Sequence, residues 1–539
     1  MLIAEFVETN FRAIFVWGVA ALVVLTAVSF AFFGPHSFWP WIVFGPMVLL
    51  GVGDMTQKRQ AIRRNYPVLG HMRYFLELIR PEIYQYFIEN DTEGVPFDRE
   101  QRSLVYQRAK NVRDTTPFGT KMNVYAPGYE WVNHSLLAHH IDAEGMRITI
   151  GGPDCKQPYS CSLLNISAMS FGSLSKNAIL ALSRGAKLNS FAHNTGEGGL
   201  SPYHLEGGGD LIWQVGTGYF ACRDAAGKFS PSMFAEKSAS PNVKMIEIKL
   251  SQGAKPGHGG ILPAAKVTPE IAAIRGVPMG QDVLSPPTHT EFSTPIGLLE
   301  FVKQLRDLSG GKPIGFKLCV GKRREFLAIC KAMIQTGITP DFITVDGGEG
   351  GTGAAPLEFS NRIGAPLVEG LIFVHNALVG YSLRSKIRII ASGKVSSGFG
   401  VLKRLAIGAD ACNSARAMMM AIGCIQALKC NSNHCPVGVA TQERHLVAGL
   451  DPTDKAARVA SYHKQTIESL AEMIGALGLN SAQELRPWHL MHRVSANETR
   501  HYGELYKFLR DGDLLADELP PDYARACNSA SAETFGHSD

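Results

Sequence analysis

The sequence contains no long run of lysine or arginine, and its 53 basic residues are nearly balanced by 48 acidic ones. The formal net charge of +5 is mild for 539 residues and does not indicate a nucleic-acid partner. Charged residues make up only 19% of the chain and hydrophobic residues 45%, which excludes a disordered protein. A chain of this length is too long for one small core, so we expect one large domain with appendages, or several domains.

Charge is also absent from residues 13–33, an uninterrupted apolar stretch about long enough to span a bilayer core as a helix. A second apolar stretch, residues 38–53, follows after a short turn; it is of marginal length and contains Pro40 and Pro46. A secretory signal peptide is the alternative for the first stretch. It fits poorly, because residues 1–10 lack the basic residues with which such a peptide begins.

Basic residues flank this pair of apolar stretches, whereas the turn between them carries no charge. Arg12 precedes the first stretch, and a basic cluster follows the second: Lys58, Arg59, Arg63 and Arg64. By the positive-inside rule, both ends of the pair face the cytoplasm. We therefore predict a two-helix transmembrane hairpin over residues 1–54 that anchors the protein in the cell membrane, with the body of the chain facing the cytoplasm.

Cysteine is scarce as well, with ten in the whole chain, yet three of them crowd into one short segment. Cys424, Cys430 and Cys435 follow a C-x5-C-x4-C pattern. Structural disulfides are not expected in a reducing cytosolic compartment. Zinc favours four ligands and closer cysteine pairs, and His434 directly precedes Cys435, so it would strain a tetrahedral loop. Three thiolates suit a 3Fe–4S cluster with one vacant iron corner, although the spacing alone fits three buried, inert cysteines equally well.

Short apolar runs alternate with longer helical patterns through the middle of the chain. Strands are predicted at residues 162–168, 245–250, 313–320, 342–347, 387–392 and 409–413. Helices are predicted at residues 175–188, 295–308, 324–337 and 397–408. Such alternation implies a parallel sheet with helical crossovers, and the number of repeats favours a closed (β/α)8 TIM barrel over an open doubly wound sheet. Functional residues are then expected at the carboxyl ends of the strands.

The loops after the last two predicted strands have the character of a phosphate site. They supply Gly393 with Lys394 and Asn413 with Ser414, each just before a helix start. Two tight structural loops are the alternative. Lys317 stands inside an otherwise apolar strand and must therefore point into the barrel mouth or be paired, because burying an unpaired charge is costly.

Five ordered motifs resemble the FMN-binding synthase domain of the glutamate synthase family, over roughly residues 154–442. They are NTGEGG, EIKLSQGAKPG, SPPTH, DGGEGGTGAAP and CIQALKCNSNHCPVGVATQ. The resemblance implies a (β/α)8 barrel that holds FMN beside a 3Fe–4S cluster, with the three cysteines of the last motif as cluster ligands. It also places FMN against a set of residues from several strands: Met169, Ser170, Gln214, Lys317, Gly393 and the loop around Ser414.

The same resemblance implies the reductive amination of 2-oxoglutarate by an oxidoreductase acting on CH–NH2 donors. Glu197, Lys249, Gln252 and Lys255 would line the substrate pocket, where ammonia gives 2-iminoglutarate and reduced flavin delivers a hydride. Glu197 is the candidate for proton management. A runner-up interpretation keeps both cofactors but has them act on another 2-oxo acid or amino acid, or pass electrons at the membrane.

The resemblance covers neither a glutaminase domain nor a nicotinamide site. We therefore expect a stand-alone form that uses ammonia and an external electron donor, either ferredoxin-like or an NADPH oxidoreductase subunit. Two positions depart from the family pattern, since His258 and Ile261 replace a glutamate and a glutamine on the substrate side. The expected organisation is a hairpin (1–54), a helical or irregular segment (55–153), the barrel with its iron–sulfur loop (154–445), a helical segment (446–527) and a polar tail (528–539).

Overall fold

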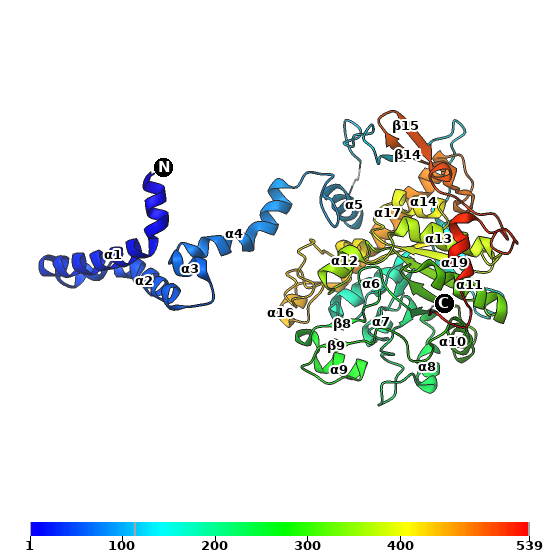
Figure 1. Cartoon of the computed structure of the whole chain (residues 1–539), viewed down its shortest axis with the longest axis horizontal. Coiled ribbons are helices and arrows are strands. Elements are labelled where there is room, and N and C mark those ends of the chain that lie inside the picture. Colours follow the sequence, from blue (N-terminus) through cyan, green and yellow to red (C-terminus); the bar gives the residue numbers. More distant parts are fainter. Residues whose placement is uncertain (1, 113–114, 537–539) are drawn as a thin grey trace. The chain divides into compact units, whose positions relative to one another are not determined.

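A computed structural model describes residues 2–112 and 115–536 (Figure 1). By its internal contacts the chain divides into two compact units, Met1–Val95 and Pro96–Asp539. The first unit is helical throughout its regular structure, and the second contains every strand among the described residues. Each unit therefore has its own set of contacts and is considered by itself.

The first unit begins with two apolar helices, α1 (Leu2–Phe33) and α2 (Trp41–Thr56), joined by a short 3-10 turn. The helices contact each other where the Trp41 indole Nε1 donates a hydrogen bond of 2.8 Å to Thr26 Oγ1. Within residues 2–112 and 115–536, the segment Asn10–Phe38 alone is long and apolar enough to cross a membrane, whereas α2, with 16 residues, is shorter. The predicted helical pair is present, and one of its members has the length of a span.

The second unit is built around a closed barrel of eight parallel strands, which confirms the predicted fold class. The barrel closes because the last strand, β13, pairs with the first, β4. In order around the barrel the strands are β4 (Leu164–Ile166), β5 (Ala192–Asn194), β6 (Asp210–Val215), β7 (Val243–Lys249), β10 (Ile314–Leu318), β11 (Phe342–Asp346), β12 (Arg388–Ser392) and β13 (Ala411–Ser414).

Helices surround this barrel, and the four that the sequence predicts are present (Figure 1). They are α6 (Lys176–Leu188), α10 (Pro295–Leu308), α11 (Arg323–Thr336) and α14 (Gly398–Ala406). Side-chain caps fix where helices begin: Ser175 accepts a hydrogen bond from the backbone of Ala178, and Ser397 from that of Gly400. The other crossover helices are α7 (Pro202–Gly207), α8 (Pro231–Ser238) and α13 (Leu367–Gly380), with α9 (Pro269–Arg275) on a longer excursion after β7.

An antiparallel hairpin of β2 (Arg147–Ile150) and β3 (Tyr159–Ser162) covers the amino-terminal end of the barrel. Its buried Ile150 and Cys161 pack against inward-facing residues of the strands, such as Phe342. This apolar plug closes the foot of the barrel, so the carboxyl ends of the strands form its mouth.

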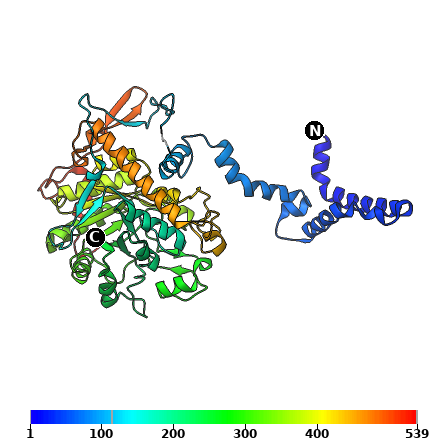
Figure 2. The same cartoon turned by 180° about the vertical axis from the view of Figure 1, so that it is seen from behind.

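The chain after the barrel returns to cover it. The long helix α17 (Pro452–Ala476) packs along α6 (Figure 2). Their approach depends on Gly185, because a Cβ atom there would lie 2.6 Å from Val459 Cβ. Beyond α17, β14 (Leu490–Ser495) pairs with both β15 (Glu498–His501) and β1 (Glu130–Val132). The amino-terminal part of this unit and its carboxyl-terminal part are thereby joined in one small sheet.

Candidate active site

An ion pair stands at the mouth of the barrel, formed by two of the predicted substrate residues. Lys249, the last residue of β7, places Nζ 2.8 Å from Oε1 of Glu197, which lies in the loop after β5. Glycines make room for the carboxylate: a Cβ atom on Gly260 would lie 2.5 Å from Glu197 Oε1, and one on Gly216 would lie 2.7 Å from Glu197 Cβ. Any larger residue at these two glycines would displace Glu197.

Three cations act on the Glu197 carboxylate. Burial alone would raise its pKa, but Lys249, Lys255 and Arg275 together hold the pKa below its usual value. Glu197 is therefore ionised, and the group carries more positive than negative charge. Arg275, the last residue of α9, is 4% exposed and donates a hydrogen bond of 3.1 Å to the carbonyl of Phe171. The sequence analysis missed Arg275, which no motif marks.

Lys255 is buried although it stands on a loop, with 2% of its surface exposed. Its Nζ donates a hydrogen bond of 2.9 Å to the carbonyl of Ala354. The pKa of Lys255 is lowered to about 8, mainly by burial. The charge of Glu197 opposes this shift, and the charge of Lys249 adds to it. Gln252 lies half-buried between the two lysines, and its carbonyl accepts a hydrogen bond of 3.4 Å from the backbone of Lys255. The structure thus brings the four predicted substrate residues to one loop cluster.

A buried histidine holds the end of β7 through the backbone carbonyl of Lys249. His289 Nε2 lies 2.9 Å from the carbonyl oxygen of Lys249, and its Nδ1 lies 2.9 Å from the hydroxyl of Tyr219. Burial lowers the pKa of His289 to about 4, so the ring is neutral at pH 7. His289 therefore orients Lys249 without adding charge to the mouth.

A second polar group lies deeper in the barrel, around the fully buried carboxylate of Glu247 on β7. Gln214 Nε2 and Asn194 Nδ2 donate to Glu247 Oε1 at 2.6 and 2.8 Å, and Thr344 Oγ1 donates to Oε2 at 2.5 Å. These contacts link β5, β6, β7 and β11. Gln214 is a predicted flavin residue, whereas Glu247 was not singled out from the sequence.

Lys317 is paired, as its position in an apolar strand requires. Its Nζ lies 3.4 Å from Asp346 Oδ2, and it is 6% exposed. Burial alone would lower the pKa of Lys317, but Asp346 and Glu247 raise it above its ordinary value. Asp346 Oδ2 also accepts a hydrogen bond of 2.9 Å from the backbone of Gly253, which ties the Lys255 loop to β11. The centre of the barrel therefore holds a permanent cation.

The predicted phosphate residues stand together at the same rim. Ser414 Oγ donates a hydrogen bond of 2.6 Å to the carbonyl of Val395, which joins the loop after β12 to the end of β13. The side-chain oxygen of Asn413 is buried and has no hydrogen-bond partner among the described residues. Lys394 is exposed, and burial of its stem together with nearby Arg416 lowers its pKa. The two cations suit an anionic ligand, whereas the buried oxygen of Asn413 suits a hydrogen-bond donor.

Gly393 precedes Lys394 directly after β12, with a φ of 150°. Across the barrel, Met169 and Ser170 follow β4 and are buried. The backbone N–H of Met169 donates a hydrogen bond of 3.1 Å to the carbonyl of Asn194, and Ser170 Oγ lies 3.1 Å from Ser173 Oγ. All the predicted flavin residues therefore lie on strands or loops at the carboxyl ends of the barrel.

The three clustered cysteines lie in the loop after β13 and its short helix α15 (Arg416–Ala421). All are free thiols. Burial, with smaller effects of Cys430 and Cys435, raises the pKa of Cys424 to about 12. Among residues 2–112 and 115–536, no three or more His, Cys, Asp or Glu side chains are close enough together to hold a metal ion. His434 is exposed, which excludes it as a buried fourth ligand.

Hydrogen bonds bind the cysteine loop to the loop after β4. Ser175 Oγ donates to the carbonyl of Gly438 at 2.7 Å. Gln442 Nε2 donates to the carbonyls of Gly172 and Leu174 at 3.1 and 2.9 Å. The segment that follows Met169 and Ser170 is thereby attached to the segment that carries the thiols.

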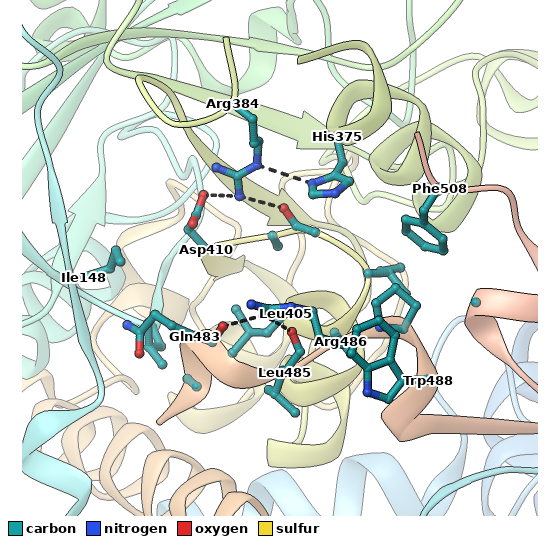
Figure 3. Close-up of a pocket in the computed structure, with 18 of the residues that line it drawn as sticks. Ile148, His375, Arg384, Leu405, Asp410, Gln483, Leu485, Arg486, Trp488 and Phe508 are labelled. Carbon is teal, nitrogen blue, oxygen red and sulfur yellow. Dashed lines mark hydrogen bonds and ion pairs between the residues drawn. The ribbon is translucent and has the colours of Figure 1, made fainter. Parts of the chain in front are cut away.

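A cavity of about 660 Å³ lies at the other end of the barrel (Figure 3). It is lined by residues that precede β12 and β13, including Arg384 and Asp410, whose side chains form an ion pair of 2.7 Å. Arg384 Nε also donates to Nδ1 of His375 at 3.3 Å. The charged groups of this cavity are paired with one another. The cavity lies at the foot of the barrel and is therefore separate from the charged mouth.

A closed (β/α)8 barrel with its charged residues at the carboxyl ends of the strands has the architecture of a barrel enzyme. A sequence profile described as the conserved region in glutamate synthase matches residues 140–480. The chain belongs to the glutamate synthase family and is, with that family, an oxidoreductase.

Three relatives show the extent of the similarity. The glutamate synthase large subunit-like protein YerD of Bacillus subtilis (strain 168) is 38% identical over 496 residues, which cover 84% of this chain and 94% of YerD. An archaeal glutamate synthase (NADPH) of Methanocaldococcus jannaschii is 36% identical over 322 residues, 60% of each chain. A ferredoxin-dependent glutamate synthase of Antithamnion sp. is 35% identical over 247 residues, 45% of this chain but only 16% of that protein.

Proposed function

We propose that this protein is an FMN- and iron–sulfur-dependent glutamate synthase. It would carry out the reductive amination of 2-oxoglutarate, in which 2-oxoglutarate, ammonium, two electrons and two protons give glutamate and water. The observation that carries the proposal is the Glu197 carboxylate set among Lys249, Lys255 and Arg275 at the mouth of a glutamate synthase family barrel.

The residues at the mouth fit FMN. Lys394 and Arg416 suit its phosphate, and the unpartnered oxygen of Asn413 suits a hydrogen-bond donor of the ligand. Lys317 remains charged deep in the barrel, where a cation stabilises a reduced, anionic flavin ring. When bound, FMN supplies the hydride chemistry of the reaction. The chain supplies the cations and the buried amide of Gln214.

The three thiols fit a 3Fe–4S cluster by their chemistry, because soft thiolates are the ligands that iron–sulfur clusters take. Cys424, Cys430 and Cys435 would hold it. Their loop is attached to the loop of Met169 and Ser170, which supports an electron relay beside the flavin. The names of two relatives mention NADPH and ferredoxin, and we propose an external donor of one of these kinds here, either ferredoxin-like or an NADPH oxidoreductase subunit.

The substrate is a dicarboxylate in this account. Lys249, Lys255 and Arg275 provide three cations against one carboxylate, so two further negative charges balance the mouth. Glu197 is positioned to exchange a proton with a bound imine while Lys249 holds its orientation. The two carboxylates of a bound substrate would balance the remaining positive charge of Lys249, Lys255 and Arg275.

A second candidate function is the reduction of a less polar 2-oxo acid. His258 packs edge-on against Phe359, with ring centroids 5.3 Å apart, and its Nδ1 lies 3.0 Å from the carbonyl of Gly259. His258 and the half-buried Ile261 stand where the family pattern has a glutamate and a glutamine, so they give this segment a less polar edge. Such an edge favours a substrate with an apolar side chain.

We also propose that the segment Asn10–Phe38, with its exposed apolar side chains, anchors the protein in the cell membrane and that the barrel unit faces the cytoplasm. The basic cluster at residues 58–64 supports this orientation.

The experiment that tests the function follows the flavin under anaerobic conditions. Protein with photoreduced flavin is mixed with 2-oxoglutarate and ammonium, and the return of the oxidised flavin absorbance is recorded. The proposal predicts that reoxidation needs both compounds. Reoxidation by an apolar 2-oxo acid with ammonium, and not by 2-oxoglutarate, would favour the second candidate.

A further inference from the structure

A buried lysine lies beside the cysteine loop, outside every motif discussed so far. Lys266 ends a 3-10 turn (Ala264–Lys266) and is 2% exposed. Its Nζ donates three hydrogen bonds to backbone carbonyls: 3.0 Å to Ser173, 2.7 Å to Cys430 and 2.8 Å to Ala440. All three donors of the ammonium group are thereby used.

These three carbonyls come from separate parts of the site. Ser173 follows the predicted flavin residue Ser170, Cys430 is the middle thiol of the cysteine loop, and Ala440 ends that loop. The neighbouring Ala265 carbonyl accepts a further hydrogen bond of 3.0 Å from Asn433. Lys266 therefore joins the loop after β4 to both sides of the cysteine loop.

The charge of Lys266 lacks a carboxylate partner. Among the residues that the structure describes, no acidic side chain forms an ion pair with it, and the ionisable groups that act on it are the thiols of Cys430 and Cys435. Carbonyl dipoles satisfy the donors but leave the net charge, and a buried net charge is costly unless an opposite charge lies near. An anionic group at the cysteines would supply that charge.

We propose that Lys266 is the counter-ion of the iron–sulfur cluster and the positioning residue that holds the cluster loop against the flavin loop. This inference rests on the proposed cluster. Gaining one electron would make the net charge of the cluster more negative by one. A nearby fixed cation stabilises this reduced form, so it raises the reduction potential of the cluster.

The test is a redox titration of the purified full-length protein, with the cluster followed by electron paramagnetic resonance and its iron content measured. Lys266→Met removes the charge and keeps most of the stem, and Lys266→Arg keeps the charge. Lys312→Met is the matched control, because Lys312 is also buried and donates to two carbonyls, those of Ser238 and Ser240, at the foot of the barrel.

Lys266→Met is expected to shift the reduction potential downward or to lose iron while FMN is retained. Lys266→Arg and Lys312→Met are expected to match the wild type. A wild-type protein with a cluster, and Lys266→Met with the same iron content and potential, would overturn the inference and leave the proposed function standing. A wild-type protein without iron would instead refute the cluster itself. If Lys266→Met does not fold, Lys266→Gln serves in its place, and an unchanged potential there also overturns the inference.

Discussion

Lys249 Nζ lies 2.8 Å from Glu197 Oε1, and this ion pair joins two segments of the barrel mouth that lie on either side of β6. The carboxylate belongs to the loop after β5, whereas the ammonium group ends β7. The pair is largely buried, with the two side chains 9% and 18% exposed, so water does little to screen it. Substitution of Lys249 or Glu197 should therefore change the reaction rate more than substitution of an exposed ion pair.

The first prediction concerns Glu197→Gln, which keeps the shape and removes the charge. We expect kcat to fall by about 100-fold, within the range that a positioned acid–base group contributes, while FMN content is unchanged. Steady-state kinetics and the ratio of FMN to protein measure this. Glu206→Gln breaks an exposed pair with Arg184 at 2.9 Å and is the control, expected to match the wild type. Equal rates for Glu197→Gln and wild type would remove Glu197 from the mechanism.

The second prediction concerns pH. The pKa of Lys255 is lowered by burial to about 8, so the side chain is charged below that pH and neutral above it. If Lys255 binds a substrate carboxylate, KM for 2-oxoglutarate should be constant below about pH 8 and rise above it, while Lys255→Arg should remove this inflection. A KM that stays flat to pH 9.5 in the wild type would contradict the role.

Lys255 also gives a prediction about stability: the free energy of unfolding should increase with pH in the range where substrate binding weakens. Its pKa is 10.5 as an ordinary lysine and about 8 in the folded protein, so the unfolded state binds more protons between these values. The cost of burying the charge is fully present below pH 8 and is relieved as the pH rises toward 10.5. Lys255→Met should therefore lose this rise in unfolding free energy, which denaturant titrations at pH 7.5 and 10 would measure.

The third prediction concerns the thiols. Cys430→Ser should abolish the 3Fe–4S signal in electron paramagnetic resonance, because serine is a poor ligand for the cluster. Cys222→Ser is the control, since Cys222 is buried and lies outside the cysteine loop. A cluster signal that survives in Cys430→Ser would show that this cysteine is not a ligand.

The fourth prediction concerns the anchor. A protein that begins at Pro96 contains the whole barrel unit, so it should be soluble without detergent and keep FMN. The full-length protein should instead sediment with membranes, because the segment Asn10–Phe38 exposes apolar side chains such as Trp17 and Phe32. Full-length protein in the soluble fraction would argue against the anchor, and loss of FMN from the shortened protein would show that the first unit supports the barrel.

Local pattern was enough to predict most of the barrel but not all of it. Six strands were predicted because each is a clear apolar run between helical patterns. β5 was missed since it has only three residues, two of them the polar His193 and Asn194. β6 was missed although it is apolar, because it directly follows a run of three glycines, Gly207 to Gly209, and a helix too short to show a period. Both strands are stabilised by pairing with their neighbours in the closed barrel, which a local sequence pattern does not reveal.

The site divides in the same way. Lys249, Lys255 and the three cysteines stand in recognisable motifs, so the sequence predicts them. Arg275 and Lys266 do not, because each acquires its role from a partner far away in the chain: Glu197 for Arg275, and the carbonyl of Cys430 for Lys266. Burial of a charge is a tertiary property, and only the folded chain shows which lysines and arginines have lost their water.

The most direct test of the central claim is to identify the product. The purified protein is supplied with 2-oxoglutarate, ¹⁵N-ammonium and reduced methyl viologen as an artificial electron donor, and the mixture is analysed by mass spectrometry. The account predicts ¹⁵N-labelled glutamate, with one molecule formed for every two electrons consumed. The Glu197→Gln variant should form it much more slowly. Protein that contains FMN and the cluster, consumes electrons and yet forms no labelled glutamate would contradict it.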